Sequence, residues 1–126
     1  MSSRPAAAKP AAAKLAAALK APALRRSARV FDALGDETRL RLVVALCAGG
    51  ALSIAQLTAG TDISRQAVTK HLQVLAGAGL VRDLKAGRER LWQFEPAELE
   101  QARQSLQRIA EQWDRALLRL KAFVET

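Results

Sequence analysis

The sequence has 126 residues, half of them apolar, and a formal charge of +8 at pH 7. A chain of this length and composition can bury one core without a metal or disulfides. Its single cysteine, Cys47, can form no intrachain disulfide, which fits a reducing compartment. No stretch approaches the roughly 18 apolar residues of a membrane span, and Lys9, Lys14 and Lys20 interrupt every candidate signal-peptide core. We therefore expect a soluble, cytoplasmic protein with no membrane partner.

Most of the positive charge lies at the N-terminus. Residues 1–31 contain seven Lys or Arg residues and no acid, and the remainder carries 13 basic and 12 acidic residues. Residues 1–26 repeat Ala, Lys and Pro, and Pro5, Pro10 and Pro22 interrupt any long helix. We predict a flexible basic tail over residues 1–26 and a folded domain over residues 27–126.

Three roles remain open for this tail. Its cations can attract phosphate and release counterions, which makes affinity fall with salt. It can equally be a solubilising leader with no further role, because charge alone does not separate the two. A transit peptide fits less well, since serine is sparse.

From Ala28 onward the apolar residues recur at helical spacing. They predict two amphipathic helices separated near Gly35 and Asp36, with Asp36 as the N-cap of the second. Gly49 and Gly50 are expected to end that helix.

The next segment has the order of a helix-turn-helix. Ser53 and Gln56 form a capping-box pattern at the start of a short helix that ends at Gly60. Residues 61–63 provide the turn, and Ser64 is placed to cap a second helix, which Gly77 and Gly79 end. Val68, Leu72 and Leu75 share the face of this second helix that we expect to be buried.

A hairpin and a long helix complete the chain. Residues 80–85 and 89–95 alternate in polarity around a tip at residues 86–88. Pro96 suits the first turn of a helix that runs nearly to Thr126. The predicted fold is mostly α with a small β-hairpin, a winged helix-turn-helix built from residues 28–95 with a long C-terminal dimerisation helix.

Candidate DNA contacts lie on the helix after Ser64 and on the hairpin. Arg65 can pair with guanine and Gln66 with adenine in the major groove, whereas Ser64, Thr69 and Lys70 suit phosphate. Exposed residues of these types are usually only solvated, but the ordered series of elements favours DNA binding. The residues that we predict to contact DNA are Ser64, Arg65, Gln66, Thr69, Lys70, His71, Gln73, Lys85, Arg88 and Arg90.

The titratable residues indicate neither catalysis nor metal binding. His71 is the only histidine, and metal sites need several donors, so we expect it to pack or to contact phosphate. Cys47 is expected to be a small buried apolar residue, with a redox switch as the alternative. No nucleophile with a base and an orienting group is apparent, so we expect no enzymatic activity and no cofactor.

The last helix has a coiled-coil-like stripe, with apolar residues spaced alternately by three and four. It can pack on its own domain, but so long a helix has more apolar length than a small body can cover. We therefore prefer pairing with a two-fold mate. The predicted homodimer interface consists of Val30, Phe31, Leu99, Leu106, Ile109, Trp113, Leu117 and Leu120.

Three segments resemble the ArsR-type family of winged-helix repressors: residues 34–46, 63–81 and 87–96. The resemblance implies a homodimer on a partly palindromic operator, with Ser64 to His71 on the DNA-contacting stretch and Arg88 on the wing. The cysteine-rich signature of the family's metal sensors is replaced by ALSIAQL at residues 51–57, and the last helix has no histidine. The resemblance thus implies the metal-free branch of the family.

Together these observations predict a sequence-specific transcriptional regulator, a repressor that binds double-stranded DNA as a homodimer. An effector of unknown chemistry stays open. One alternative is a nucleoid-associated or architectural protein that binds through the basic tail, with similar affinity for all duplexes and steep salt dependence. Another is a protein-interaction module with the same fold, which the nearly neutral body leaves open.

Overall fold

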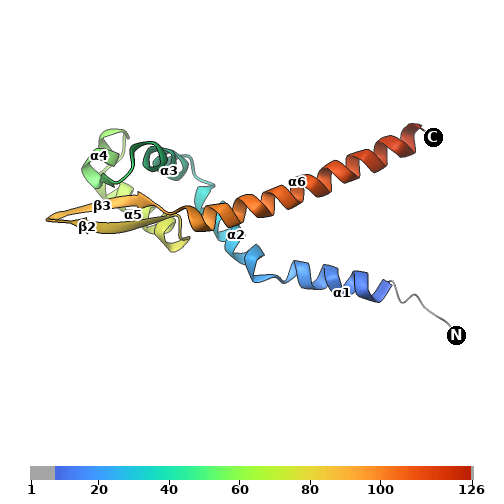
Figure 1. The fold of residues 1–126 in the computed structure, drawn as a ribbon. Coiled ribbons are helices and arrows are strands. Elements are labelled where there is room, and N and C mark those ends of the chain that lie inside the picture. The colour runs from blue at the N-terminus through green and yellow to red at the C-terminus, as the bar shows by residue number, and fades with distance from the viewer. Residues whose placement is uncertain (1–7, 126) are drawn as a thin grey trace.

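The computed structural model describes residues 8–125. The elements in chain order are α1 (Ala8–Leu19), α2 (Pro22–Leu34), α3 (Glu37–Gly49), β1 (Leu52–Ser53), α4 (Ile54–Ala59), α5 (Arg65–Gly77), β2 (Val81–Ala86), β3 (Glu89–Phe94) and α6 (Pro96–Glu125). Helices α3 to α5 and the hairpin form a head, from which α6 and α1 extend on the same side (Figure 1). The mostly helical architecture, the small sheet and the long last helix confirm the predicted fold class.

Side-chain caps fix where α3, α4 and α5 begin. Asp36 accepts a hydrogen bond from the Arg39 backbone N–H at 3.0 Å, which makes it the N-cap of α3 as predicted. Ser53 and Gln56 exchange both bonds of the capping box at α4. The Ser64 hydroxyl accepts from the Ala67 N–H at 3.1 Å and caps α5. Sequence patterns alone therefore located all three starts.

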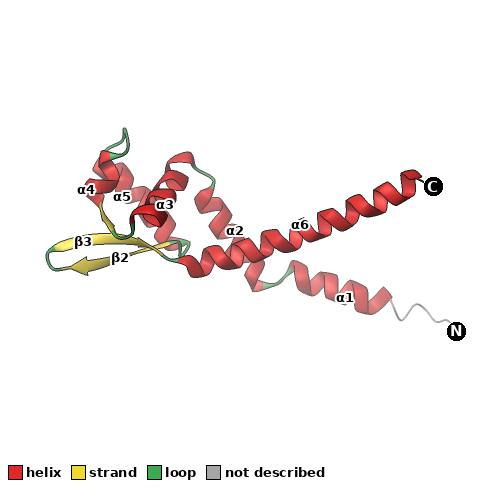
Figure 2. Ribbon diagram, turned by 45° about the horizontal axis from the view of Figure 1, so that its top comes forward, coloured by secondary structure: helices red, strands yellow, loops and turns green. Residues whose placement is uncertain are grey.

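The sheet has one strand more than the sequence predicted. Strands β2 and β3 pair antiparallel from Val81 opposite Phe94 to Ala86 opposite Glu89, which leaves a two-residue tip. Gly87 at this tip has φ of +65°, a conformation that favours glycine. Strand β1 adds to the other edge of β3, with Leu52 opposite Trp92, so the order is β1-β3-β2 (Figure 2). A strand of two residues is too short to show an alternating pattern.

The core lies where α2 and the start of α6 pack against the head. Val68, Leu72 and Leu75 of α5 are fully buried, which confirms the predicted inner face of that helix. The other large, fully buried side chains are Val30, Leu42, Leu46 and Leu80. Burial of this face fixes which side of α5 remains in solvent.

The N-terminal region differs from the expected extended tail. Residues 8–19 form α1, and α2 begins at Pro22, before the expected boundary at residue 26. Alanine has the highest helix propensity, and both Pro10 and Pro22 lie in the first turn of a helix, where the missing N–H is not needed. Residues 1–7 of the predicted tail lie outside the described residues. The division at residue 26 stays a prediction, but it falls within a continuous helix.

Cys47 was wrongly expected to be buried. It lies on the exposed side of α3, one helical turn from exposed Val44. The residues of α3 that are buried in the core are Leu42, Val43 and Leu46. The apolar character of the segment indicated a helix but did not identify which of its faces is buried.

Candidate nucleic-acid interface

Helix α5 presents a row of polar side chains to solvent. Arg65, Gln66, Lys70 and Gln73 are exposed, while the opposite face of the helix is anchored in the core. With Thr69 and Ile54 they line a shallow concave surface between the start of α4 and α5. Residues 63–82 contain no Asp or Glu, so no carboxylate of this segment neutralises the row. Such a surface suits a polyanion.

The hydroxyl groups of Ser64 and Thr69 already form hydrogen bonds with the backbone of α5. Ser64 accepts the Ala67 N–H as the N-cap, and Thr69 Oγ1 donates to the Arg65 carbonyl oxygen at 2.8 Å. Each bond fixes the rotamer of its side chain. Ser64 keeps its hydroxyl proton for a further acceptor, whereas Thr69 has already used its proton. Ser64 is therefore the better donor to phosphate.

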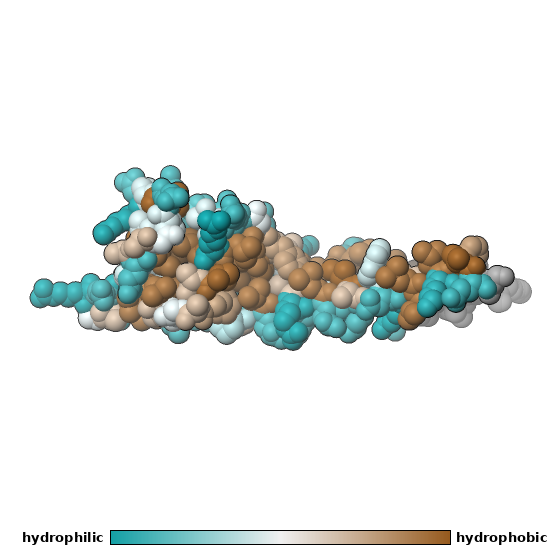
Figure 3. Space-filling view, turned by 90° about the horizontal axis from the view of Figure 1, so that it is seen from above, coloured by the Kyte–Doolittle hydropathy of each residue, from teal (hydrophilic) through white to brown (hydrophobic). Residues whose placement is uncertain are grey.

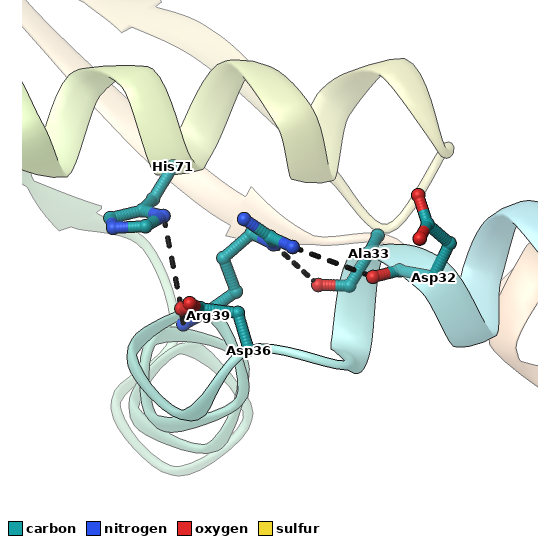
Figure 4. Close-up of polar contacts among 5 residues, drawn as sticks. All are labelled: Asp32, Ala33, Asp36, Arg39 and His71. Carbon is teal, nitrogen blue, oxygen red and sulfur yellow. Dashed lines mark hydrogen bonds and ion pairs between the residues drawn. The ribbon is translucent and has the colours of Figure 1, made fainter.

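His71 faces the body of the protein instead of the exposed row. Its Nδ1 lies 3.9 Å from Asp36 Oδ2 at the start of α3, and a quarter of its side chain is exposed (Figure 4). Of the two roles expected for this residue, packing is the one that the geometry supports. The predicted contact of His71 with phosphate stays a prediction.

Asp36 and Arg39 hold the corner between α2 and α3, against which His71 lies. The Arg39 backbone N–H donates to the Asp36 carboxylate and is the main reason that the pKa of Asp36 lies below its usual value. The Arg39 guanidinium donates to the carbonyl oxygens of Ala33, at 2.6 Å, and Asp32, at 3.4 Å. These carbonyls lie in the last turn of α2, where the Asp32 oxygen also accepts from the Gly35 backbone N–H at 3.1 Å. Arg39 was not among the residues predicted from sequence, although a basic residue shortly after a helix end is a recognisable signal.

The wing offers three cations of unequal availability. Arg88 lies at the exposed tip, and Lys85 is exposed on β2 directly opposite Arg90 on β3. Arg90 Nε lies 3.1 Å from Asp83 Oδ2, so Asp83 partly neutralises its charge. Lys85 and Arg88 form no ion pair with any residue in the described range 8–125. They are the wing cations best placed to meet phosphate.

The predicted dimer interface divides into exposed and buried residues. The α6 residues Leu106, Ile109, Trp113, Leu117 and Leu120 are 46–63% exposed. Seen from above, apolar residues follow the length of α6 away from the head (Figure 3). Phe31 is 36% exposed and remains available.

Two residues of that predicted interface pack within the single chain. Val30 is fully buried, so it has no surface left for a second copy, and we withdraw it from the interface. Leu99 is partly buried against the core cluster. The helical spacing showed that both residues lie on apolar faces. It did not show whether those faces pack within one chain or against a second copy.

Within residues 8–125, no group of three His, Cys, Asp or Glu side chains is arranged to hold a metal ion. None of the helices in that range is both long and apolar enough to cross a membrane.

Comparison with known families and proteins supports the architecture of this site. A family model described as a helix-turn-helix domain matches residues 34–83, from the end of α2 into β2. The HTH-type transcriptional regulator Rv2034 of Mycobacterium tuberculosis is 41% identical over 93 residues, which cover 74% of this chain and 83% of that protein.

Two solved structures extend the comparison. An ArsR-like transcriptional regulator from Rhodococcus sp. RHA1 superposes with a TM-score of 0.70 at 38% identity, over 79% of this chain and 93% of the other. The homodimeric winged helix-turn-helix DNA-binding domain Mb0332 from Mycobacterium bovis gives a TM-score of 0.57 at 28% identity, over 73% and 84% of the two chains.

Proposed function

Because the chain belongs to the ArsR-type family of winged helix-turn-helix transcriptional regulators, we propose that it represses transcription by binding a palindromic operator as a homodimer. DNA binding and transcriptional regulation are the function of the family. The operator's symmetry, the sign of regulation and the contacting residues are the parts that we propose.

The exposed row on α5 is the observation that carries the proposed contacts. Arg65 and Gln66 lie in the first turn of α5, the part of a recognition helix that meets base edges in the major groove. Arg65 is proposed to pair with guanine and Gln66 with adenine, each pair contributing about 1–3 kcal/mol of discrimination. Ser64, Thr69, Lys70 and Gln73 are proposed to contact the backbone or the groove edge. On the wing, Lys85, Arg88 and Arg90 reach the flanking phosphates.

The homodimer is supported by the exposed apolar stripe of α6. Leu106, Ile109, Trp113, Leu117 and Leu120 leave a long apolar surface that a monomer does not cover. The related Mb0332 domain is homodimeric. A two-fold axis through α6 would present two α5 helices to half-sites about 10 bp apart, roughly one turn of DNA.

Selection of bound duplexes from a random-sequence pool tests this function. The full-length protein is expected to enrich a palindrome at physiological salt. Arg65→Ala and Gln66→Ala are each expected to relax one position per half-site and to weaken operator binding by about 1–3 kcal/mol.

Matched controls on α6 separate base recognition from loss of charge or side-chain volume. Arg103, which pairs with Glu100 on the same helix, and exposed Gln104 are replaced by alanine. Both controls are expected to enrich the same motif as the unchanged protein. If no motif is enriched and every duplex binds alike with a steep salt dependence, the protein is an architectural DNA binder and the proposal is wrong.

We also propose that the protein acts in the cytoplasm, as a regulator without catalytic activity. The single cysteine and the absence of a catalytic arrangement in the sequence support this part of the proposal.

A further inference from the structure

Helix α1 lies outside the body of its own chain. Residues 11–20 are all exposed, with Leu15 at 60% and Leu19 at 68% exposure. The helix has 12 residues, and isolated helices shorter than about 12–15 residues are marginal in water even when rich in alanine. Its stability as a helix therefore calls for a packing partner.

The residue types of α1 favour an apolar partner over phosphate. Residues 11–19 read AAAKLAAAL, in which Lys14 is the only charge. Leu15 and Leu19 are four positions apart and share one face of the helix. Exposed leucines on an otherwise alanine-rich helix are suited to packing against another helix.

Helix α6 has an unpaired apolar surface on the same side of the head. Ile109, Leu117 and Leu120 are about half exposed. In one chain, α1 and the outer half of α6 diverge from a common vertex (Figures 1 and 2). The leucines of both helices, Leu15 and Leu19 of α1 and Leu117 and Leu120 of α6, are 46–68% exposed within one copy.

A groove lies at that vertex and is continuous with the proposed dimer interface. It has a volume of about 540 Å³ and separates the end of α1 and the start of α2 from α6. Leu19 and Leu24 line one wall, and Ile109, a residue of the exposed α6 stripe, lines the other. A helix that enters between these walls would contact α1 on one side and α6 on the other.

We propose that α1 of each copy packs through Leu15 and Leu19 on α6 of the second copy, so that the two copies clasp each other reciprocally. This inference rests on the homodimer of the proposed function and adds an element outside the matched helix-turn-helix segment. A second copy suits the groove because its α6 offers an apolar stripe of the same kind, and a two-fold axis satisfies both α1 helices at once. The basic N-terminal region would then secure the dimer before it contacts any DNA.

Crosslinking between differently sized full-length copies tests the clasp. In a Cys47→Ala background, one copy carries Leu15→Cys, and the larger copy carries Ile109→Cys, Leu117→Cys or Leu120→Cys in turn. A short bismaleimide is added to the mixed dimer. Because each copy has one thiol, a product of mixed size reports contact between copies. At least one of the three positions is expected to crosslink efficiently.

The matched control is Ala17→Cys, on the face of α1 opposite the leucines. It is expected to yield at least tenfold less mixed product than Leu15→Cys. Sedimentation of the same samples gives the oligomeric state. A dimer in which Leu15→Cys crosslinks no better than Ala17→Cys at all three positions overturns the clasp and leaves the proposed function intact. A monomer at all concentrations overturns both.

A second pair of variants measures the energetic effect of the clasp. Leu15→Lys with Leu19→Lys is expected to raise the dimer dissociation constant at least tenfold. Ala13→Lys with Ala17→Lys adds the same charge to the opposite face and is expected to leave that constant within twofold. If both double variants raise the dissociation constant equally, the added charge explains the change and the proposal is wrong.

Discussion

Ser27 of α2 and Ser105 of α6 hydrogen-bond through their hydroxyl groups at 2.8 Å where the two helices pack against each other. Both residues are almost fully buried, at 2% and 3% exposure. Ser27→Ala would leave the Ser105 Oγ with only the longer bond from Arg108, at 3.4 Å, and its buried hydroxyl proton without an acceptor. We expect this variant to lower the free energy of unfolding by about 1–3 kcal/mol. Urea unfolding of the variant at fixed protein concentration measures this loss.

The double variant distinguishes a lost hydrogen bond from lost volume. Ser27→Ala with Ser105→Ala removes both polar groups, so we expect it to be more stable than the sum of the two single variants implies. Additive single effects would show that the two hydroxyls are not coupled.

Gly79 and Gly77, which lie two residues apart near the end of α5, are expected to respond oppositely to alanine. Gly79 has φ of +79°, and a Cβ there would lie 2.7 Å from Glu98 Cγ, whose carboxylate pairs with Arg26. We expect Gly79→Ala to cost at least about 1–2 kcal/mol from backbone conformation alone. Gly77→Ala, which meets nothing within 4 Å, should be neutral or slightly stabilising. Thermal unfolding compares the two, and equal melting temperatures would refute this account.

The Asp36 carboxylate is expected to make the stability of the head depend on acid pH. The Arg39 backbone N–H holds the pKa of Asp36 below its usual value. Because the folded-state pKa is the lower one, the stabilisation is fully present above the unfolded value of about 3.9 and is lost as the pH falls through the folded value. The stability difference between the unchanged protein and Asp36→Asn should therefore shrink as the pH is lowered from about 6 to about 3.

The control for this pH dependence is Glu89→Gln on the wing. Glu89 is exposed and forms no ion pair with any residue in the described range. Unfolding by urea at each pH should give a difference for Glu89→Gln that stays nearly constant. If the difference for Asp36→Asn is equally flat, the Asp36 cap is not the source of the pH dependence.

Local signals made most of the fold predictable from sequence. The caps at Asp36, Ser53 and Ser64 depend on hydrogen bonds within three residues, so the residue types and their spacing suffice. The buried face of α5 follows from its helical periodicity. The hairpin was likewise predicted from local alternation, although its tip is residues 87–88 and not the predicted residues 86–88, because Ala86 pairs with Glu89.

The features that were missed depend on contacts between distant segments. Periodicity shows that Val30 and Cys47 lie in helices with apolar residues, but the packing of α2 and α3 on the head decides that Val30 is buried and Cys47 exposed. His71 likewise turns toward Asp36 because α5 packs beside the start of α3. The prolines led to the prediction of an extended tail, because the high helix propensity of the alanines between them was not considered.

Arg88 and Arg90 on the wing should differ in their contribution to DNA affinity, because only Arg90 has a carboxylate partner. Arg88 at the exposed tip is expected to contact a phosphate, so Arg88→Ala should weaken binding to all duplexes alike. It should also reduce the slope of log affinity against log salt by about 0.9 per phosphate contact. Arg90 already pairs with Asp83 at 3.1 Å, so Arg90→Ala should change the slope less. Fluorescence anisotropy on a labelled duplex over a salt series measures both slopes. A larger change for Arg90→Ala would show that the Asp83 pair breaks on binding and that Arg90 is the phosphate contact.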